Sequence, residues 1–336
     1  MLFGGFLSCQ KSDTGTEVAD HFFLQSEGAV MPVFVNGNVK SNVFVIYLHG
    51  GPGGTSLEAY QHPESPFTKL QNDFAVVYWD QRCAGASQGE NTKLTLNQYT
   101  NDLEKLIVLL KHKYGTQISF FLVGHSWGGS LGVNYLTRPQ NQQNVKGWIE
   151  VGGGHNVPRI VALERDMVLT VGNRQIQLGN NATDWQNIIN QAQKLNLTII
   201  DDLYKMNVLA VQAEGLMRNK DSVNAKISNN WISEFFSGPT EVFRANKNLE
   251  LSVEGMKEEL AVINLSDKLQ NITVPTLMIW GNYDFRVPPE FANEELQKYG
   301  SEKKELVIFE KSAHFVQWNE PLRFYEVVND FIDRNK

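Results

Sequence analysis

The most constraining feature of the sequence is an abrupt change of pattern at Gly124. Residues 118–123 are largely apolar, as expected for a short buried strand, and Gly124-His-Ser-Trp-Gly-Gly129 follows directly. A helix is expected to begin at Ser126. The small residues on either side let the chain turn sharply, so that the Ser126 hydroxyl projects from the turn beside the free amides of the helix N-terminus. This pattern predicts a nucleophilic serine at position 126.

Further apolar runs indicate that this strand belongs to a larger sheet. They occupy residues 43–48, 74–79, 147–151, 276–280 and 305–309. Strands that are apolar on both faces are typical of a parallel sheet with helices packed on each side. Residues 21–35 predict an antiparallel hairpin before it, because two β-rich segments are broken at Glu27-Gly28. The sequence therefore predicts an α/β fold with a mostly parallel sheet and helices on both faces.

The alternation of strands and helices is interrupted in the second half of the chain. Between residues 158 and 267 the apolar residues follow a helical spacing, as at Trp185, Ile188 and Ile189, and strand patterns resume only afterwards. A chain of 336 residues is long enough for one α/β domain with such an insertion. We expect an N-terminal segment at 1–17, the first part of the core at 18–157, a helical cap at 158–267 and the second part of the core at 268–336.

A nucleophilic serine needs a general base, and the base needs an acid that orients it. In an α/β sheet these groups follow late strands, at the carboxyl ends where such sheets build their sites. Asp284 and His314 each follow one of the last two apolar runs, and they are the expected acid and base. Asp80 and Asp267 fit less well, because Asp80 precedes the serine in the chain and Asp267 precedes its strand.

A second glycine-rich segment, His49-Gly-Gly-Pro-Gly-Gly54, follows the apolar run at residues 43–48. Acyl transfer places negative charge on a carbonyl oxygen, and rigidly held backbone amides stabilise that charge. The expected donors are the amide of Gly51 and the amide of Trp127, the residue after the serine. A phosphate cradle fits the segment less well, since both the P-loop Lys-Ser/Thr pair and the G-x-G-x-x-G order are missing.

Composition limits the classes of partner. The chain has 30 Lys and Arg against 37 Asp and Glu, a net charge of −7, and no basic run, so no nucleic-acid partner is expected. The two cysteines lack the spacing of a structural zinc site, and serine-based acyl transfer requires no metal or organic cofactor. We expect a small-molecule or short-peptide substrate, and the sequence leaves the oligomeric state open.

The N-terminus has two interpretations. Residues 1–7 are almost wholly apolar, and Ser8-Cys9 and a polar stretch follow, an order that resembles the tail of a bacterial lipoprotein signal with Cys9 as the lipidated residue. A cytoplasmic protein with a frayed terminus is the alternative. The sequence has no apolar stretch of about 18 residues, so no transmembrane span is expected.

The order of these motifs resembles a known family. The H-G-G-P-G sequence at 49–53, Trp79-Asp-Gln-Arg82, the G-x-S-W-G turn, Asp284 and His314 together are similar to the α/β-hydrolases of the proline iminopeptidase group. The resemblance covers nearly the whole chain outside the cap. It implies an α/β-hydrolase fold and a serine aminopeptidase that releases an N-terminal residue through an acyl-enzyme. By position it also implies the triad Ser126, Asp284 and His314, with Gly51 and Trp127 as oxyanion donors.

Members of this group hold the free amine of the peptide with acidic residues of the cap. The resemblance makes Glu164, Glu214 and Glu234 candidates for that role. His49 and His155, which adjoin glycine-rich loops, are further candidates for contact with substrate. Two alternatives remain: a carboxylic-ester or small-amide hydrolase that uses the same triad, and a hydrolase-fold protein that only binds a ligand.

Overall fold

The structure is a computed structural model that describes residues 17–56, 59–60, 64–89, 92–218 and 239–336. Two residues named above, Cys9 and Glu234, lie outside these ranges. Within the ranges, no helix combines the length and the apolar character needed to cross a bilayer.

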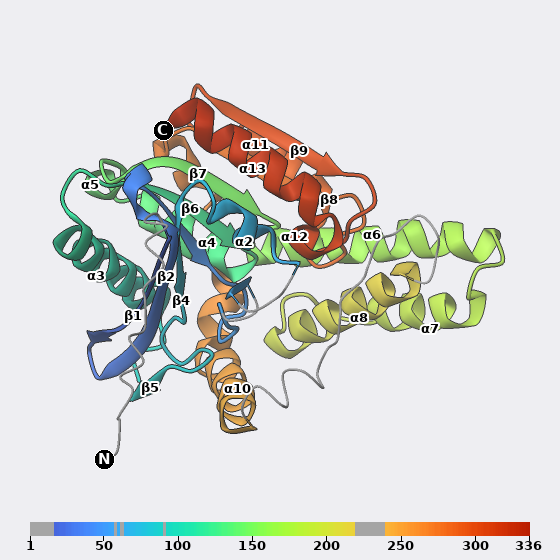
Figure 1. The fold of residues 1–336 in the computed structure, drawn as a ribbon. Helices are drawn as coiled ribbons and strands as arrows, with labels where there is room; N and C mark the ends of the chain where they lie inside the picture. Colours follow the sequence, from blue (N-terminus) through green and yellow to red (C-terminus); the bar gives the residue numbers. More distant parts are fainter. Residues whose placement is uncertain (1–16, 57–58, 61–63, 90–91, 219–238) are drawn as a thin grey trace, which may run out of the picture.

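The described residues form one nine-stranded sheet (Figure 1). Its spatial order is β1-β2-β4-β3-β6-β7-β8-β9, and β5 pairs with β2. The strands from β4 to β9 in this order run parallel, whereas β1 and β2 form the antiparallel hairpin expected from the sequence. Their bounds are β1 Glu17–Ser26, β2 Ala29–Asn38, β3 Val43–Leu48, β4 Ala75–Trp79, β5 Gln88–Gly89, β6 Ser119–His125, β7 Val145–Val151, β8 Thr276–Gly281 and β9 Lys304–Phe309.

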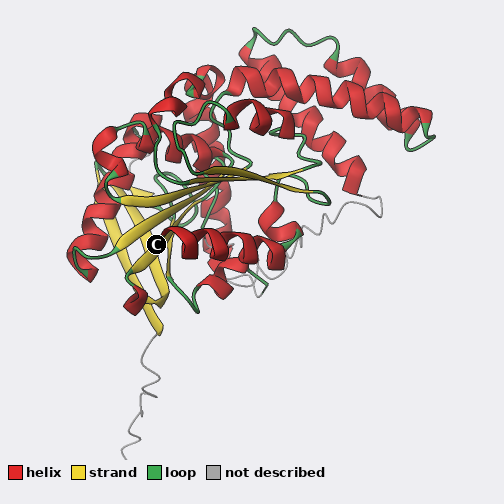
Figure 2. Cartoon of the chain, turned by 90° about the horizontal axis from the view of Figure 1, so that it is seen from above, coloured by secondary structure: helices red, strands yellow, loops and turns green. Residues whose placement is uncertain are grey.

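Helices cover both faces of the sheet (Figure 2). Side chains of β3 alternate between the two layers, so that Phe44 packs in one apolar cluster and Val45 in the other. The first cluster includes side chains of α3 (Leu96–Tyr114), α4 (Trp127–Leu136) and α11 (Pro289–Leu296), and the second includes side chains of α2 (Pro66–Leu70), α12 (Val316–Asn319) and α13 (Pro321–Asn335). The short elements are α5 (Pro139–Gln142), η1 (Val39–Ser41) and η2 (Ser266–Asn271). The predicted fold class is confirmed.

Among the residues that the structure describes, four long helices lie between β7 and β8 in the chain. They are α6 (Val157–Gln177), α7 (Ala182–Ala192), α8 (Ile200–Arg218) and α10 (Pro239–Val262). Helices α6, α7 and α8 share a third apolar cluster, which includes Trp185 and Met206 and is joined by Ala261 of α10 and Phe285. The three helices extend beyond the end of the sheet in Figure 1. We propose that these helices form the cap expected at residues 158–267.

The strand register brings several loops to one edge of the sheet. Leu48 of β3 pairs with Gly124 of β6, and the next residue of β6, His125, pairs with Val151 of β7. Gly281 of β8 pairs with Phe309 of β9 in the same way. Because the strands are parallel and end together, the glycine-rich loop, the Ser126 turn, and the loops with Asp284 and His314 all leave the same edge.

Candidate active site

Ser126 occupies a sharp turn between β6 and α4. Its backbone has φ 55° and ψ −115°, a strained conformation for a residue with a side chain. The turn forms because its neighbours are glycines: a Cβ at Gly128 would lie 2.0 Å from the carbonyl oxygen of Leu48, and a Cβ at Gly124 would lie 2.4 Å from the Trp148 ring. Ser126 is half-buried, and it is the N-cap residue of α4.

His314 and Asp284 form a buried hydrogen-bonded pair. The Nδ1 atom of His314 lies 2.8 Å from Oδ2 of Asp284, and the other carboxylate oxygen accepts the amides of Arg286 and Val287 at 3.0 and 2.8 Å. Burial raises the pKa of Asp284, and these backbone hydrogen bonds offset part of the increase. His125 Nε2 donates to the carbonyl oxygen of His314 at 3.0 Å, so the backbone of His314 is also held in place.

Two glycines show how closely the loops approach one another. A Cβ at Gly152, after β7, would lie 3.1 Å from Asp284 Oδ2 and 3.3 Å from His314 Nδ1. A Cβ at Gly50, after β3, would lie 3.3 Å from the Ser126 Cβ. The expected serine, acid, base and glycine-rich loop therefore meet at one edge of the sheet.

His49 lies inside its own loop, where both nitrogens of its ring have protein partners. Its Nδ1 donates to the carbonyl oxygen of Gly50 at 2.9 Å, and its Nε2 accepts the amide of Gln81 at 3.1 Å. The side chain is 1% exposed, and burial lowers its pKa, so the ring is neutral and both nitrogens have protein partners. The expected contact of His49 with substrate stays a prediction.

His155 is likewise bound within the protein, between two carboxylates. Nδ1 lies 2.7 Å from Oε1 of Glu150, and Nε2 lies 3.3 Å from Oε2 of Glu295. Glu150 also accepts the hydroxyl of Tyr299 at 2.7 Å, and His155 is 0% exposed. The structure thus places His155 in an internal ion network, and its expected contact with substrate stays a prediction.

The two expected cap acids that the structure describes are both buried. Glu164 on α6 and Glu214 on α8 are both fully buried. Oε1 of Glu164 accepts from Asn207 at 2.7 Å, whereas its Oε2 has no hydrogen-bond partner among the residues described. Burial raises the pKa of Glu164 well above its usual value, and the nearby charge of Asp284 adds to the increase. The guanidinium of Arg286 lies 3.9 Å from Glu214 and packs over the ring of Phe315.

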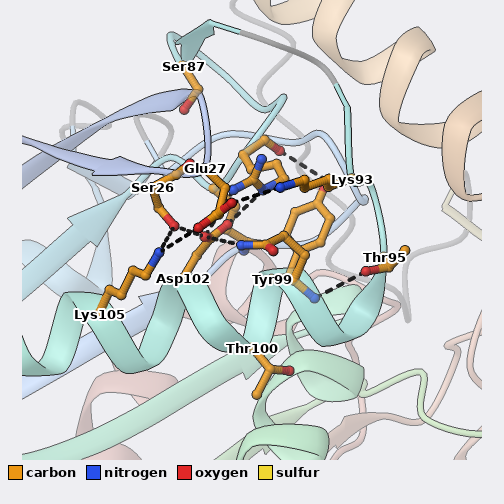
Figure 3. A network of polar contacts seen from close by, with 12 residues as sticks. Ser26, Glu27, Ser87, Lys93, Thr95, Tyr99, Thr100, Asp102 and Lys105 are labelled. Atoms are coloured by element: carbon orange, nitrogen blue, oxygen red, sulfur yellow. Dashed lines mark hydrogen bonds and ion pairs between the residues drawn. The ribbon is translucent and has the colours of Figure 1, made fainter.

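A buried ion pair beside the site was not predicted from the sequence. Arg82, directly after β4, binds Asp102 of α3 through Nε at 2.8 Å and Nη2 at 3.0 Å, and neither side chain is exposed. Asp102 also accepts the hydroxyl of Ser26 at 2.6 Å (Figure 3). The network joins the hairpin, the loop after β4 and α3. The sequence motif Asp80-Gln81-Arg82 includes Arg82, but no pattern in the sequence identified Asp102 as its partner.

Comparison with known proteins identifies the fold family. Residues 43–321 match the model of the alpha/beta hydrolase fold family. A proline iminopeptidase of Saccharolobus solfataricus is 28% identical over 306 residues, which cover 88% of this chain and 86% of the relative. Two solved structures share the fold. A proline iminopeptidase of Mycobacterium smegmatis has 16% sequence identity and a TM-score of 0.62, and the match covers 94% of this chain and 98% of that one. An esterase of Exiguobacterium antarcticum has 19% identity and a TM-score of 0.59, and the match covers 93% of this chain and 98% of that one. The chain therefore belongs to the alpha/beta hydrolase fold family.

Proposed function

We propose that this chain is a serine hydrolase that works through an acyl-enzyme. Ser126 attacks the carbonyl carbon of the substrate, His314 accepts its proton and then donates it to the leaving group, and Asp284 orients the imidazole. The observation that supports this most directly is the 2.8 Å contact between His314 and Asp284, at the sheet edge where Ser126 occupies its strained turn.

The oxyanion would be stabilised by two backbone amides. The amide of Trp127 belongs to the first residue of α4, where helix amides have no partner within the helix. The amide of Gly51 belongs to the loop in which Gly50 packs against Ser126. Two amides held by a rigid backbone need no reorganisation as the negative charge develops.

We further propose that the preferred substrates are peptides or arylamides with a free N-terminal amine, as for a proline iminopeptidase. Glu164 and Glu214 support this, because both carboxyl groups are buried near the loop with Asp284 and Arg286, and Oε2 of Glu164 could accept from an ammonium group. A substrate ammonium would stabilise the charged form of Glu164, which burial disfavours. The relative from Saccharolobus solfataricus bears that name. The alternative is an ester or small-amide hydrolase. It is favoured by the guanidinium of Arg286, because this cation of the protein already lies beside Glu214.

Replacing Ser126 tests the mechanism. Ser126→Ala should lower kcat by about 10⁴ to 10⁶ and abolish covalent labelling by an organophosphonate, since triad members act as a unit. Ser41→Ala, in the short helical turn η1 before β3, is the matched control and should be labelled normally. If Ser126→Ala were still labelled, the nucleophile would be another residue.

Blocking the substrate amine tests the specificity. N-acetylation of a good aminoacyl arylamide should abolish cleavage, and Glu164→Gln and Glu214→Gln should each lower kcat/KM for the free amine by about 10- to 100-fold, the usual value of a hydrogen bond to a charged group. Turnover of simple aryl esters should change little in both variants. Glu258→Gln, an exposed acid on α10, serves as the control. Equal cleavage of blocked and free amines would establish the ester or amide hydrolase alternative.

A further inference from the structure

Gln81 connects the two segments that contain the proposed oxyanion donors. Its side chain is fully buried directly after β4. Its Oε1 accepts the indole N–H of Trp127 at 2.9 Å, and its Nε2 donates to the carbonyl oxygen of His49 at 3.2 Å. Its backbone amide donates to His49 Nε2 at 3.1 Å. One residue thus binds both the glycine-rich loop and the first residue of α4.

The contact with His49 determines the direction of the Gly51 amide. The Gly50 carbonyl and the Gly51 N–H belong to the same trans peptide plane, so they point in opposite directions. His49 Nδ1 donates to that carbonyl at 2.9 Å and so fixes the plane. Nδ1 carries the proton because Nε2 accepts the Gln81 amide. The backbone amide of Gln81 therefore selects the His49 tautomer that fixes the orientation of Gly51 N–H, and the Gln81 side chain holds the preceding peptide of the loop through the carbonyl oxygen of His49.

The contact with Trp127 restrains the second donor. The indole is bound to Gln81 at its N–H, and it packs edge to face against Tyr99, with ring centroids 5.3 Å apart. The hydroxyl of Tyr99 donates to the carbonyl oxygen of Arg82 at 3.0 Å. The side chain of Trp127, and with it the start of α4, is therefore attached to the same segment that fixes His49.

The residues on each side of Gln81 anchor it independently. Asp80 accepts the amide and hydroxyl of Ser56 at 2.7 and 2.8 Å. Arg82 forms the buried pair with Asp102. These anchors do not depend on the Gln81 side chain, so its loss should disturb the alignment of the two donors more than the fold.

From these contacts we infer that Gln81 is a positioning residue that aligns the Gly51 and Trp127 amides for the oxyanion. The inference rests on the proposed function. Misaligned donors weaken stabilisation of the transition state but leave ground-state binding of the substrate nearly unchanged, so the loss should appear in kcat and not in KM.

The test compares Gln81→Met, which has similar length but no side-chain hydrogen bonds, with the wild type. Using p-nitrophenyl acetate, we expect kcat to fall about 10- to 100-fold while KM changes less than about twofold. Affinity for trifluoroacetophenone, which forms a tetrahedral oxyanion on the nucleophile, should fall by the same factor as kcat. Gln71→Met removes a hydrogen bond to Tyr78, which is not among the residues assigned to the site, and is the matched control, with no change in either quantity expected.

A second variant keeps the inference testable if Gln81→Met does not fold. Trp127→Phe removes the indole N–H from the contact with Gln81, and it should also lower kcat and inhibitor affinity together. In the Trp127→Phe background, Gln81→Met should cost less than it does in the wild type. Full kcat in either variant, or a fall in kcat with unchanged inhibitor affinity, would overturn the role of Gln81. The proposed function would fail separately, if Ser126→Ala kept its activity.

Discussion

Replacing His155 with glutamine should remove a pH dependence from the folding stability of this protein. The imidazole lies between the carboxylates of Glu150 and Glu295, with no exposed surface. Burial alone would lower the pKa of His155, but the charges and hydrogen bonds of the two carboxylates outweigh burial and raise the pKa from 6.5 to about 9. Glutamine can keep a hydrogen bond here but cannot titrate.

The magnitude follows from the difference between the two pKa values. Each factor of ten in proton affinity is worth about 1.4 kcal/mol, so a rise from 6.5 to about 9 corresponds to about 3 kcal/mol. Below pH 6.5 the histidine is protonated in both the folded and the unfolded chain, and this stabilisation is fully present. Between pH 6.5 and 9 the unfolded chain loses its proton first. The stabilisation therefore declines across this range and is nearly gone above pH 9.

Urea denaturation at pH 6 and at pH 9.5 measures the effect. The free energy of unfolding of the wild type, minus that of His155→Gln, should be smaller by about 3 kcal/mol at the higher pH. Taking the difference cancels the titration of groups that do not interact with His155. His112→Gln, at an exposed position on α3, is the matched control substitution. A difference between wild type and His155→Gln that stays constant from pH 6 to 9.5 would refute a charged, carboxylate-bound His155.

Three further predictions follow from buried groups. Asp102→Ala leaves the guanidinium of Arg82 buried without its partner and should lower the free energy of unfolding by about 3–5 kcal/mol, as measured in urea; a loss below about 1 kcal/mol would contradict the buried pair. Gly128→Ala places a Cβ 2.0 Å from the backbone of β3, so it should lower the free energy of unfolding by at least about 1–3 kcal/mol and remove most of the activity. Gly215→Ala, at a helical site with open space, should raise the free energy of unfolding by about 0.5–1 kcal/mol. Equal melting temperatures of the two variants would show that the turn can adapt. Glu164→Gln should stabilise the fold more at pH 8 than at pH 5, because a carboxyl whose pKa is raised by burial lowers the stability of the fold once the pH exceeds its unfolded pKa of 4.5. Thermal denaturation at the two pH values measures this, and a gain in stability that does not depend on pH would refute the raised pKa of Glu164.

Local patterns were sufficient to predict most of the sheet. The apolar run at residues 43–48 matches β3, and the hairpin broken at Glu27-Gly28 matches β1 and β2. The strand predicted at 118–123 continues to His125, because the residues before Ser126 still pair with β7. Strand pattern and glycine turns act over a few residues, so the sequence alone determined where Ser126, Asp284 and His314 lie relative to their strands.

Only the tertiary structure decided which side chains meet. His49 and His155 were expected at the substrate, but the packed loops give both rings protein partners, one of them Glu295, which lies 140 residues from His155. Gln81 and Trp127 are 46 residues apart, and their contact depends on β4, β3 and β6 lying side by side in the sheet. Burial makes each of these polar atoms need a partner. Which partner it finds depends on the order of the strands and the packing of the helices, and no local pattern in the chain records that order.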